Sequence, residues 1–212
     1  MTTLAIGVQL CGLSSLASAQ IKDADGDGGF TFSKATRRSD LLIGVGAGLN
    51  VGRARGYPNE VDKIDNPAYK ADTRNTLGGG GSAWLGLAFN DWLSFALGAA
   101  SMNLASDEFT ASGTGFMFRV ETFPLFAQGG AFRDFGVCGD FGVGLLKIKA
   151  DGEEKADGAF MSLIGVGAFY EGWRLGPVAI GPIVEYTHLF SQSAKLYSTL
   201  YGVRVALYTG PG

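Results

Sequence analysis

The strongest constraint in this sequence is an alternation of apolar and small or polar residues with a period of two. Between residues 41 and 52 every second position is apolar, namely Ile43, Val45, Ala47, Leu49 and Val51. The positions between them are Gly44, Gly46, Gly48, Asn50 and Gly52. Successive side chains of a β-strand point to opposite faces, so this period predicts a strand with one apolar face and excludes an amphipathic helix.

The same period recurs in seven later segments. They are residues 76–90, 93–99, 116–123, 135–145, 164–171, 180–187 and 201–208. Charged residues in these segments fall on one parity, which leaves the other face of each strand apolar. Eight such segments predict an all-β fold, an eight-stranded antiparallel up-and-down transmembrane β-barrel over residues 40–208. Longer polar connections at 54–75, 104–113 and 149–158 alternate with shorter ones, which predicts long loops at one end of the barrel.

Composition favours strands as the elements that meet lipid. The chain has 34 glycines, 46% hydrophobic residues, 17% charged residues and a mean hydropathy of +0.17. Its longest nearly uncharged apolar stretch beyond the N-terminus covers only residues 41–51, whereas a membrane-spanning helix needs about 18 or more. An open sheet would leave backbone groups unpaired in hydrocarbon, so the strands must close into a barrel. The net charge of −3 argues against nucleic acid as a partner.

The N-terminus has the pattern of a secretory signal. An apolar run over residues 4–16 precedes Ala17, Ser18 and Ala19, the small-x-small pattern that signal peptidase cleaves. We expect a signal peptide over 1–19, a periplasmic lead segment over 20–39 and a C-terminal tail over 209–212. The alternative is that the first residues form a strand or helix. Cleavage would leave Cys138 as the single cysteine, so no internal disulfide is expected.

Aromatic residues gather at two levels of the predicted barrel. Near the shorter turns lie Phe89, Trp92, Phe126, Phe135, Tyr170, Trp173 and Tyr208. Near the longer loops lie Phe109, Phe116, Phe160, Phe190, Tyr197 and Tyr201. Two such levels match the interfacial girdles of membrane barrels.

These features together resemble small Gram-negative outer-membrane barrels of the OmpA/OmpX type. The resemblance covers residues 40–208 and rests on the signal, the eight dyad-repeat strands and the final strand 202–208. It implies a porin-like protein of the cell envelope in the outer membrane. It also implies contact with outer-membrane lipid and lipopolysaccharide, without a cofactor.

The interior-facing parity suggests a buried ionic network. It carries Arg119, Glu121, Asp140, Glu171, Glu185 and Arg204. The lumen of eight strands is just wide enough to be filled by side chains, so two arginines must be shared among four acids. A gate or proton path is the alternative role for these charges.

Glycines leave one interior wall of the barrel thin. They occupy positions 44, 46, 48, 52, 78, 80 and 86. The space beside them is either a narrow water-filled cavity or the place into which Trp84, Met117, Phe123, Leu125 and Phe169 project.

Two further patterns are candidate sites. Asp23, Asp25 and Asp27 have the spacing of a calcium loop, although Lys34 stands where the bidentate carboxylate is needed. This segment is a weak calcium site or a solvated linker.

His188 with Ser191 and Glu185 has the residue types of a lipid-modifying triad. Strand parity separates His188 from Glu185, which favours an interfacial anchor instead.

We therefore expect a non-catalytic structural or surface-interaction barrel. Residues 54–75 would be its main outward surface for envelope or surface partners. The alternatives are a narrow channel for small solutes, a lipid A-modifying enzyme and a soluble lipocalin-like barrel.

Overall fold

The computed structural model describes residues 37–128 and 130–210. In this part of the chain, eight long strands form the barrel: β1 (Asp40–Gly56), β3 (Thr76–Asn90), β4 (Leu93–Ala105), β5 (Thr110–Thr122), β6 (Phe135–Ala150), β7 (Glu153–Tyr170), β9 (Val178–Phe190) and β10 (Ala194–Tyr208). Two short strands, β2 (Ala71–Asp72) and β8 (Trp173–Leu175), pair with β1 and β9. Three 3-10 turns are also present: η1 (Pro67–Tyr69), η2 (Phe126–Gln128) and η3 (Gly130–Asp134). Within these residues, no helix combines the length and the apolar composition needed to cross a membrane.

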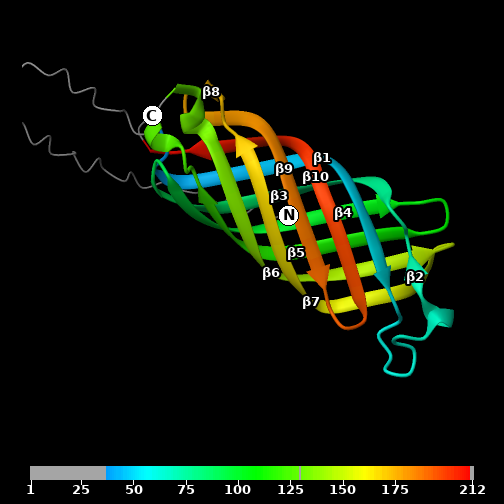
Figure 1. The fold of residues 1–212 in the computed structure, drawn as a ribbon. Helices are drawn as coiled ribbons and strands as arrows, with labels where there is room; N and C mark the ends of the chain where they lie inside the picture. Colours follow the sequence, from blue (N-terminus) through cyan, green and yellow to red (C-terminus); the bar gives the residue numbers. More distant parts are fainter. Residues whose placement is uncertain (1–36, 129, 211–212) are drawn as a thin grey trace, which may run out of the picture. The chain divides into compact units, whose positions relative to one another are not determined.

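The strands form a closed antiparallel meander, as predicted. Each long strand pairs with the next one in sequence, and β10 pairs with both β9 and β1 (Figure 1). Following cross-strand partners once round the barrel from Val45 leads back to β1 at Arg55, ten residues further along. With a rise of about 3.3 Å per residue and about 4.8 Å between strands, that offset tilts the strands by about 40°.

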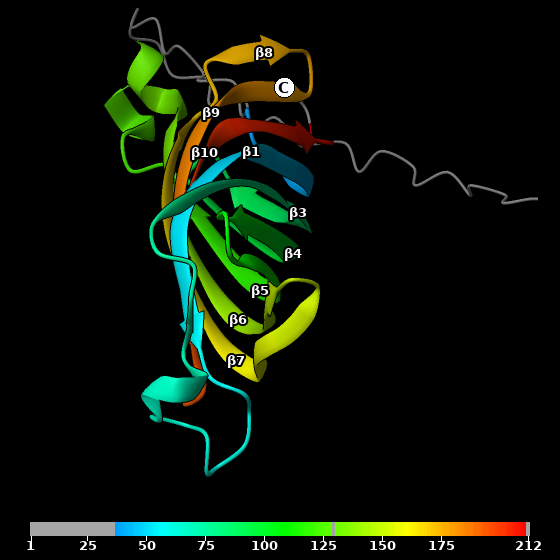
Figure 2. The ribbon, with the colours of Figure 1, turned by 90° about the vertical axis from the view of Figure 1, so that its right-hand side faces the viewer.

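The two ends of the barrel differ from the prediction of alternating loop lengths. The end that carries residues 57–75 is called the loop end, and the end where β1 begins and β10 finishes is called the terminal end (Figures 1 and 2). Among the described connections of the loop end, only 57–75 is long, because 106–109, 151–152 and 191–193 are tight turns. The prediction was wrong because β6 and β7 continue through charged residues. Lys147 on β6 pairs with Glu154 on β7 at 2.9 Å.

The outer wall of the barrel is apolar and exposed. Leu77, Leu85 and Phe116 point outward and are 65%, 56% and 57% exposed. Their neighbours along each strand point inward and are buried or half-buried. A soluble protein rarely exposes so much contiguous apolar surface, whereas a membrane barrel presents it to lipid.

The aromatic girdles are present, except that Phe126 packs against the interior apolar cluster around Phe123 and Phe169 and that two further residues differ from the prediction. Trp92 and Trp173 are exposed at the terminal end. Tyr208, which the sequence placed in that girdle, is 1% exposed and donates a hydrogen bond from its hydroxyl to Glu171 at 2.8 Å. Phe109, placed in the other girdle, packs against the interior apolar cluster. Both rings lie near strand ends, where residue counting alone does not distinguish a girdle from the barrel mouth.

Candidate functional site

The interior of the barrel is the first candidate site, and its loop-end half is apolar. The larger side chains of this cluster are Met102, Leu104, Leu146, Ile148, Met161, Leu163, Leu189 and Leu196, each 4% exposed or less. They come from inward positions on β4, β6, β7, β9 and β10. This cluster was not predicted because the loop-end parts of the strands were left out: the segments of β4, β6 and β9 were ended too early and those of β7 and β10 were begun too late. In these parts of the strands, inward apolar residues still alternate with outward polar residues. That alternation was the signal in the sequence from which the cluster could have been predicted.

The middle of the interior is an ionic layer built on two arginines. Arg119 on β5 pairs with Asp140 on β6, with both nitrogen–oxygen distances at 2.8 Å, and also with Glu185 on β9. Both carboxylates and Arg119 are at most 4% exposed.

Arg204 on β10 forms the second half of this layer. It pairs with Glu121 at 2.9 and 3.0 Å and with Glu171 at 2.9 Å. The Arg119 and Arg204 guanidinium carbons lie over the Trp84 ring, 4.4 and 5.0 Å from its centroid. The structure thus brings the six charged residues singled out in the sequence into one layer of the interior.

A second ionic group closes the terminal end. Arg38, immediately before β1, is 1% exposed and pairs with Asp134 at 2.7 Å and Glu171 at 3.0 Å. Its guanidinium carbon lies 3.5 Å from the centroid of the Phe123 ring. Arg174 on β8 also reaches Glu171, at 3.1 Å.

This end group resolves the excess of acids seen in the sequence. Four further arginines and two further acids join the predicted set, so the described network holds six of each: Arg37, Arg38, Arg119, Arg133, Arg174 and Arg204 with Asp91, Glu121, Asp134, Asp140, Glu171 and Glu185. Their formal charges balance. The added residues lie in turns, in the three-residue strand β8 or before the first strand, where no periodicity marks a side chain as buried.

Asp91, in the turn between β3 and β4, ties this group to the start of the barrel. Its carboxylate accepts hydrogen bonds from the backbone N–H groups of Arg37 and Arg38 at 2.7 and 3.0 Å, and Arg133 pairs with it. Burial raises the pKa of Asp91, but these hydrogen bonds and the Arg133 charge outweigh burial and hold the pKa below its ordinary value.

Trp84 fills the glycine-lined wall at Gly44 and Gly46, whereas Phe123 and Phe169 lie against Gly136 on β6. Trp84 is 3% exposed and lies directly against Gly44, where a Cβ atom would overlap the indole ring. Met117, Phe123 and Phe169 are also buried. Leu125 lies half-buried in the connection after β5.

A small polar cavity remains beside the ionic layer. It measures about 20 Å³, and Asn50, Glu185 and Ser198 are among its lining residues. Each of these three has a buried polar side-chain atom without a hydrogen-bond partner among the described residues. The space has the size and polar lining of a site for a single water molecule.

One cluster has the residue types of a metal site. Potential ligand atoms of Cys138, Asp140 and Glu185 lie within 4.8 Å of one another, and all three residues are buried. The Arg119 guanidinium already pairs with both carboxylates, and its positive charge opposes a cation there. The arrangement is that of an ion-pair cluster.

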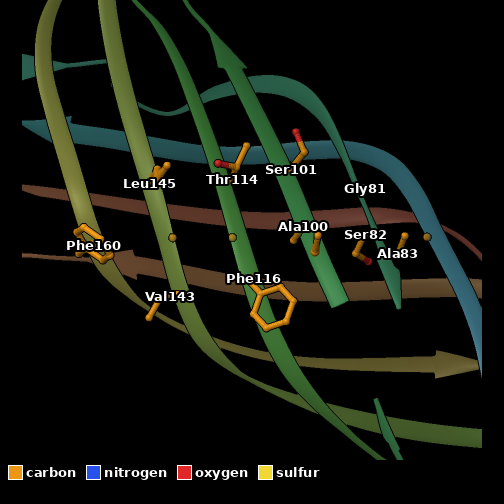
Figure 3. Close-up of a pocket in the computed structure, with 14 residues that line it drawn as sticks. Gly81, Ser82, Ala83, Ala100, Ser101, Thr114, Phe116, Val143, Leu145 and Phe160 are labelled. Carbon is orange, nitrogen blue, oxygen red and sulfur yellow. The ribbon is translucent and has the colours of Figure 1, made fainter. Parts of the chain in front are cut away.

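A broad apolar hollow of about 860 Å³ lies on the outer wall across β3 to β7 (Figure 3). Small residues such as Gly81, Ala83 and Ala99 line it together with the rings of Phe116 and Phe160. Phe160 is 88% exposed and has a φ of 53°, at a bulge where β7 carries extra residues opposite β6. The hollow lies on the outward-facing side of these paired strands, where it can hold acyl chains.

The triad weighed as an alternative does not assemble. His188 points outward, with its ring stacked on Tyr197 at a centroid distance of 4.3 Å. Glu185 points inward to Arg119, and the Ser191 hydroxyl bonds to the backbone of Ala194 in the β9–β10 turn.

The calcium candidate Asp23, Asp25 and Asp27 lies outside the described residues, as do the expected signal peptide and most of the lead segment.

Comparison with known proteins identifies the fold. No protein-family model and no curated sequence matches this chain. Among solved structures, Neisserial surface protein A aligns with a TM-score of 0.51 and 11% identity, over 79% of this chain and 96% of that one. The attachment invasion locus protein Ail of Yersinia pestis gives 0.49 and 11%, over 80% and 99%. The outer membrane protein OprG from Pseudomonas aeruginosa gives 0.42 and 12%, over 81% and 98%. At these identities the likeness concerns the fold, and the chain has the closed eight-stranded barrel of Neisserial surface protein A.

Proposed function

We propose that this protein is a barrel of the Gram-negative outer membrane that acts as a closed structural and surface-exposed element. The terminal end would face the periplasm and the loop end would face outward. The observation that carries the proposal is the filled interior. The exposed apolar wall supports a membrane location and counts against the soluble lipocalin-like alternative.

Closure has two physically different parts. A polar solute entering from the loop end would meet the packed apolar cluster around Leu104, Ile148 and Leu196. One entering from the terminal end would have to separate ion pairs such as those of Arg38 and Arg204. Leaving a buried charge without its partner costs about 3–5 kcal/mol. Both barriers favour a closed barrel over the channel alternative.

The loop of residues 57–75 is the surface proposed for partners. It is the long connection of the loop end and extends away from the strands (Figure 2). Val61 is 94% exposed and Tyr69 is 46% exposed, beside the charged pair Glu60 and Lys63. Exposed apolar and aromatic side chains among charges are typical of a contact surface.

Conductance and accessibility measurements test the two parts of this proposal. The purified protein, reconstituted in a planar bilayer, should give no steady single-channel steps, while a general porin inserted in the same way provides the conducting control. Regular steps would overturn closure. An epitope inserted after Val61 should be reached by antibody on intact cells, and protection of that epitope would overturn the outward orientation of the loop.

A further inference from the structure

A group of cations lies at the loop end beside β1 and β10, and we call it the basic rim. It consists of Arg53 and Arg55 on β1, Lys195 on β10 and Lys70 in the loop 57–75. Arg55 on β1 lies directly opposite Lys195 on β10 in the cross-strand register. Both are on the outward parity of their strands, as the buried neighbours Ala54 and Leu196 show. Like charges directly opposite each other destabilise a sheet. The pair therefore carries an energetic penalty that a bound anion would relieve.

One carboxylate, that of Asp72 on β2, lies opposite Arg55 on the other side of β1, but it pairs with Arg53 and Lys70 rather than with Arg55. Asp72 bonds to Arg53 at 2.8 and 2.5 Å, and the Lys70 ammonium lies 3.8 Å from the same carboxylate. Within the described residues, no carboxylate oxygen lies within 4 Å of the charged nitrogens of Arg55 or Lys195. The Arg55 guanidinium carbon lies instead 5.9 Å from the centroid of the Tyr197 ring.

Two hollows meet at Arg55. One measures about 230 Å³ and is lined by Arg55, Lys70 and Lys195 together with Ser193 and Gln192. The acidic residue on its lining is Asp65, which leaves an excess of positive charge there. Arginine and lysine side chains beside an amide donor such as that of Gln192 provide the hydrogen bonds that phosphate oxygens accept.

The second hollow places the site at the lipid interface. It measures about 370 Å³ and is lined by Arg53, Arg55, Tyr186 and Tyr197 among others. On the outward face of β10, Tyr197 is followed by Thr199 and then Tyr201. The outward residues after Tyr201 are apolar. Aromatic residues with polar edges mark the level of lipid headgroups, so the cations stand directly above that level.

We propose that the basic rim binds the phosphate of a phosphorylated lipid in the outer leaflet, with Arg55 and Lys195 as its main ligands and Lys70 closing the hollow. The lipid source follows from the position of the site on the lipid-facing wall. A soluble phosphate would not need a site that continues into the aromatic girdle. This inference rests on the membrane location proposed above, and it is independent of whether the barrel conducts.

Binding by the full chain in nonionic detergent tests the proposal. The probes are phosphatidic acid, diacylglycerol with the same chains, and inorganic phosphate, with bound lipid counted by native mass spectrometry. Wild type should bind phosphatidic acid in preference to diacylglycerol. Arg55→Gln with Lys195→Gln should weaken binding about tenfold or more, the effect of losing one charge-assisted hydrogen bond.

The matched control removes the same charges from the opposite wall. Lys147→Gln with Lys149→Gln changes two outward cations on β6, but Glu154 already pairs with Lys147. This variant should bind phosphatidic acid like wild type. Equal weakening in both double variants would overturn the site. Binding of inorganic phosphate as tight as that of phosphatidic acid, or of diacylglycerol as tight as that of phosphatidic acid, would overturn a phosphorylated lipid as its ligand.

Thermal stability gives a second readout with an expected change of sign. In nonionic detergent, Lys195→Gln should raise the midpoint of unfolding because it removes a like charge opposite Arg55, while Lys195 has no acidic cross-strand partner. In micelles that contain phosphatidic acid, the same variant should lower the midpoint because a ligand is lost. A shift of the same sign in both media would overturn the proposal. A conducting barrel would refute closure while leaving these results unaffected.

Discussion

The replacement Arg204→Ala should destabilise the folded barrel strongly. Arg204 is fully buried, and its guanidinium pairs with Glu121 and Glu171 and lies 3.7 Å from the centroid of the Phe169 ring. After truncation, Glu171 keeps Arg38 and other donors. Glu121 keeps only a long contact with Ser94, at 3.4 Å, among its side-chain partners in the described residues. The expected loss is therefore that of one orphaned buried charge, about 3–5 kcal/mol.

The loss should appear as a lower thermal midpoint. For a domain of this size, 1 kcal/mol corresponds to about 2–4 °C, so the midpoint should fall by roughly 6–20 °C. Heat-dependent gel mobility of the barrel in detergent and urea unfolding in lipid vesicles both measure the change. Lys149→Ala, at an exposed position, is the control and should leave the midpoint nearly unchanged.

A double variant separates the orphaned charge from lost packing. Adding Glu121→Gln to Arg204→Ala removes the uncompensated charge but not the space left by the arginine. The double variant should therefore be more stable than Arg204→Ala alone. An Arg204→Ala midpoint equal to wild type, or a double variant less stable than the single one, would refute the reasoning.

Three further predictions concern other parts of the barrel. Because folding holds the pKa of Asp91 below the ordinary 3.8 of its unfolded state, its stabilising contribution is complete above that pH and is lost as pH falls through the lower folded value. Asp91→Asn should therefore flatten the loss of stability below about pH 4 in urea titrations, and an unchanged acid profile would contradict this. Gly44→Ala should cost about 1–3 kcal/mol because its Cβ overlaps the interior tryptophan. Gly79→Ala, whose Cβ makes only an ordinary contact with the Gly48 carbonyl oxygen at 3.9 Å, should change the unfolding free energy by less than about 0.5 kcal/mol. Arg38→Ala should lower the midpoint of unfolding far more than Arg37→Ala, because Arg37 is 38% exposed and Arg38 is 1% exposed; equal effects would show that the terminal group is not buried in the folded protein.

The alternating period was enough to predict the barrel itself. A strand with Ile, Val or Leu at every second position has one apolar face that must be removed from water. In a chain with so few charges, the lipid bilayer covers that face. The same parity predicted which side of each strand faces the interior, and hence the inward positions of Arg119, Glu121, Asp140 and Arg204. These properties are local, because side-chain direction in a strand depends only on its own backbone.

The tertiary structure decided what periodicity cannot encode. Arg38 and Asp134 complete the ionic network from outside the strands, and their burial depends on how turns fold back across the barrel end. The opposition of Arg55 and Lys195 depends on the register that closes β10 onto β1, a contact between segments 140 residues apart. Such pairings are set by the strand offset round the whole barrel and not by any neighbouring residue. The sequence by itself therefore determined the wall of the barrel, while closure determined its contents and the charge pattern of its rim.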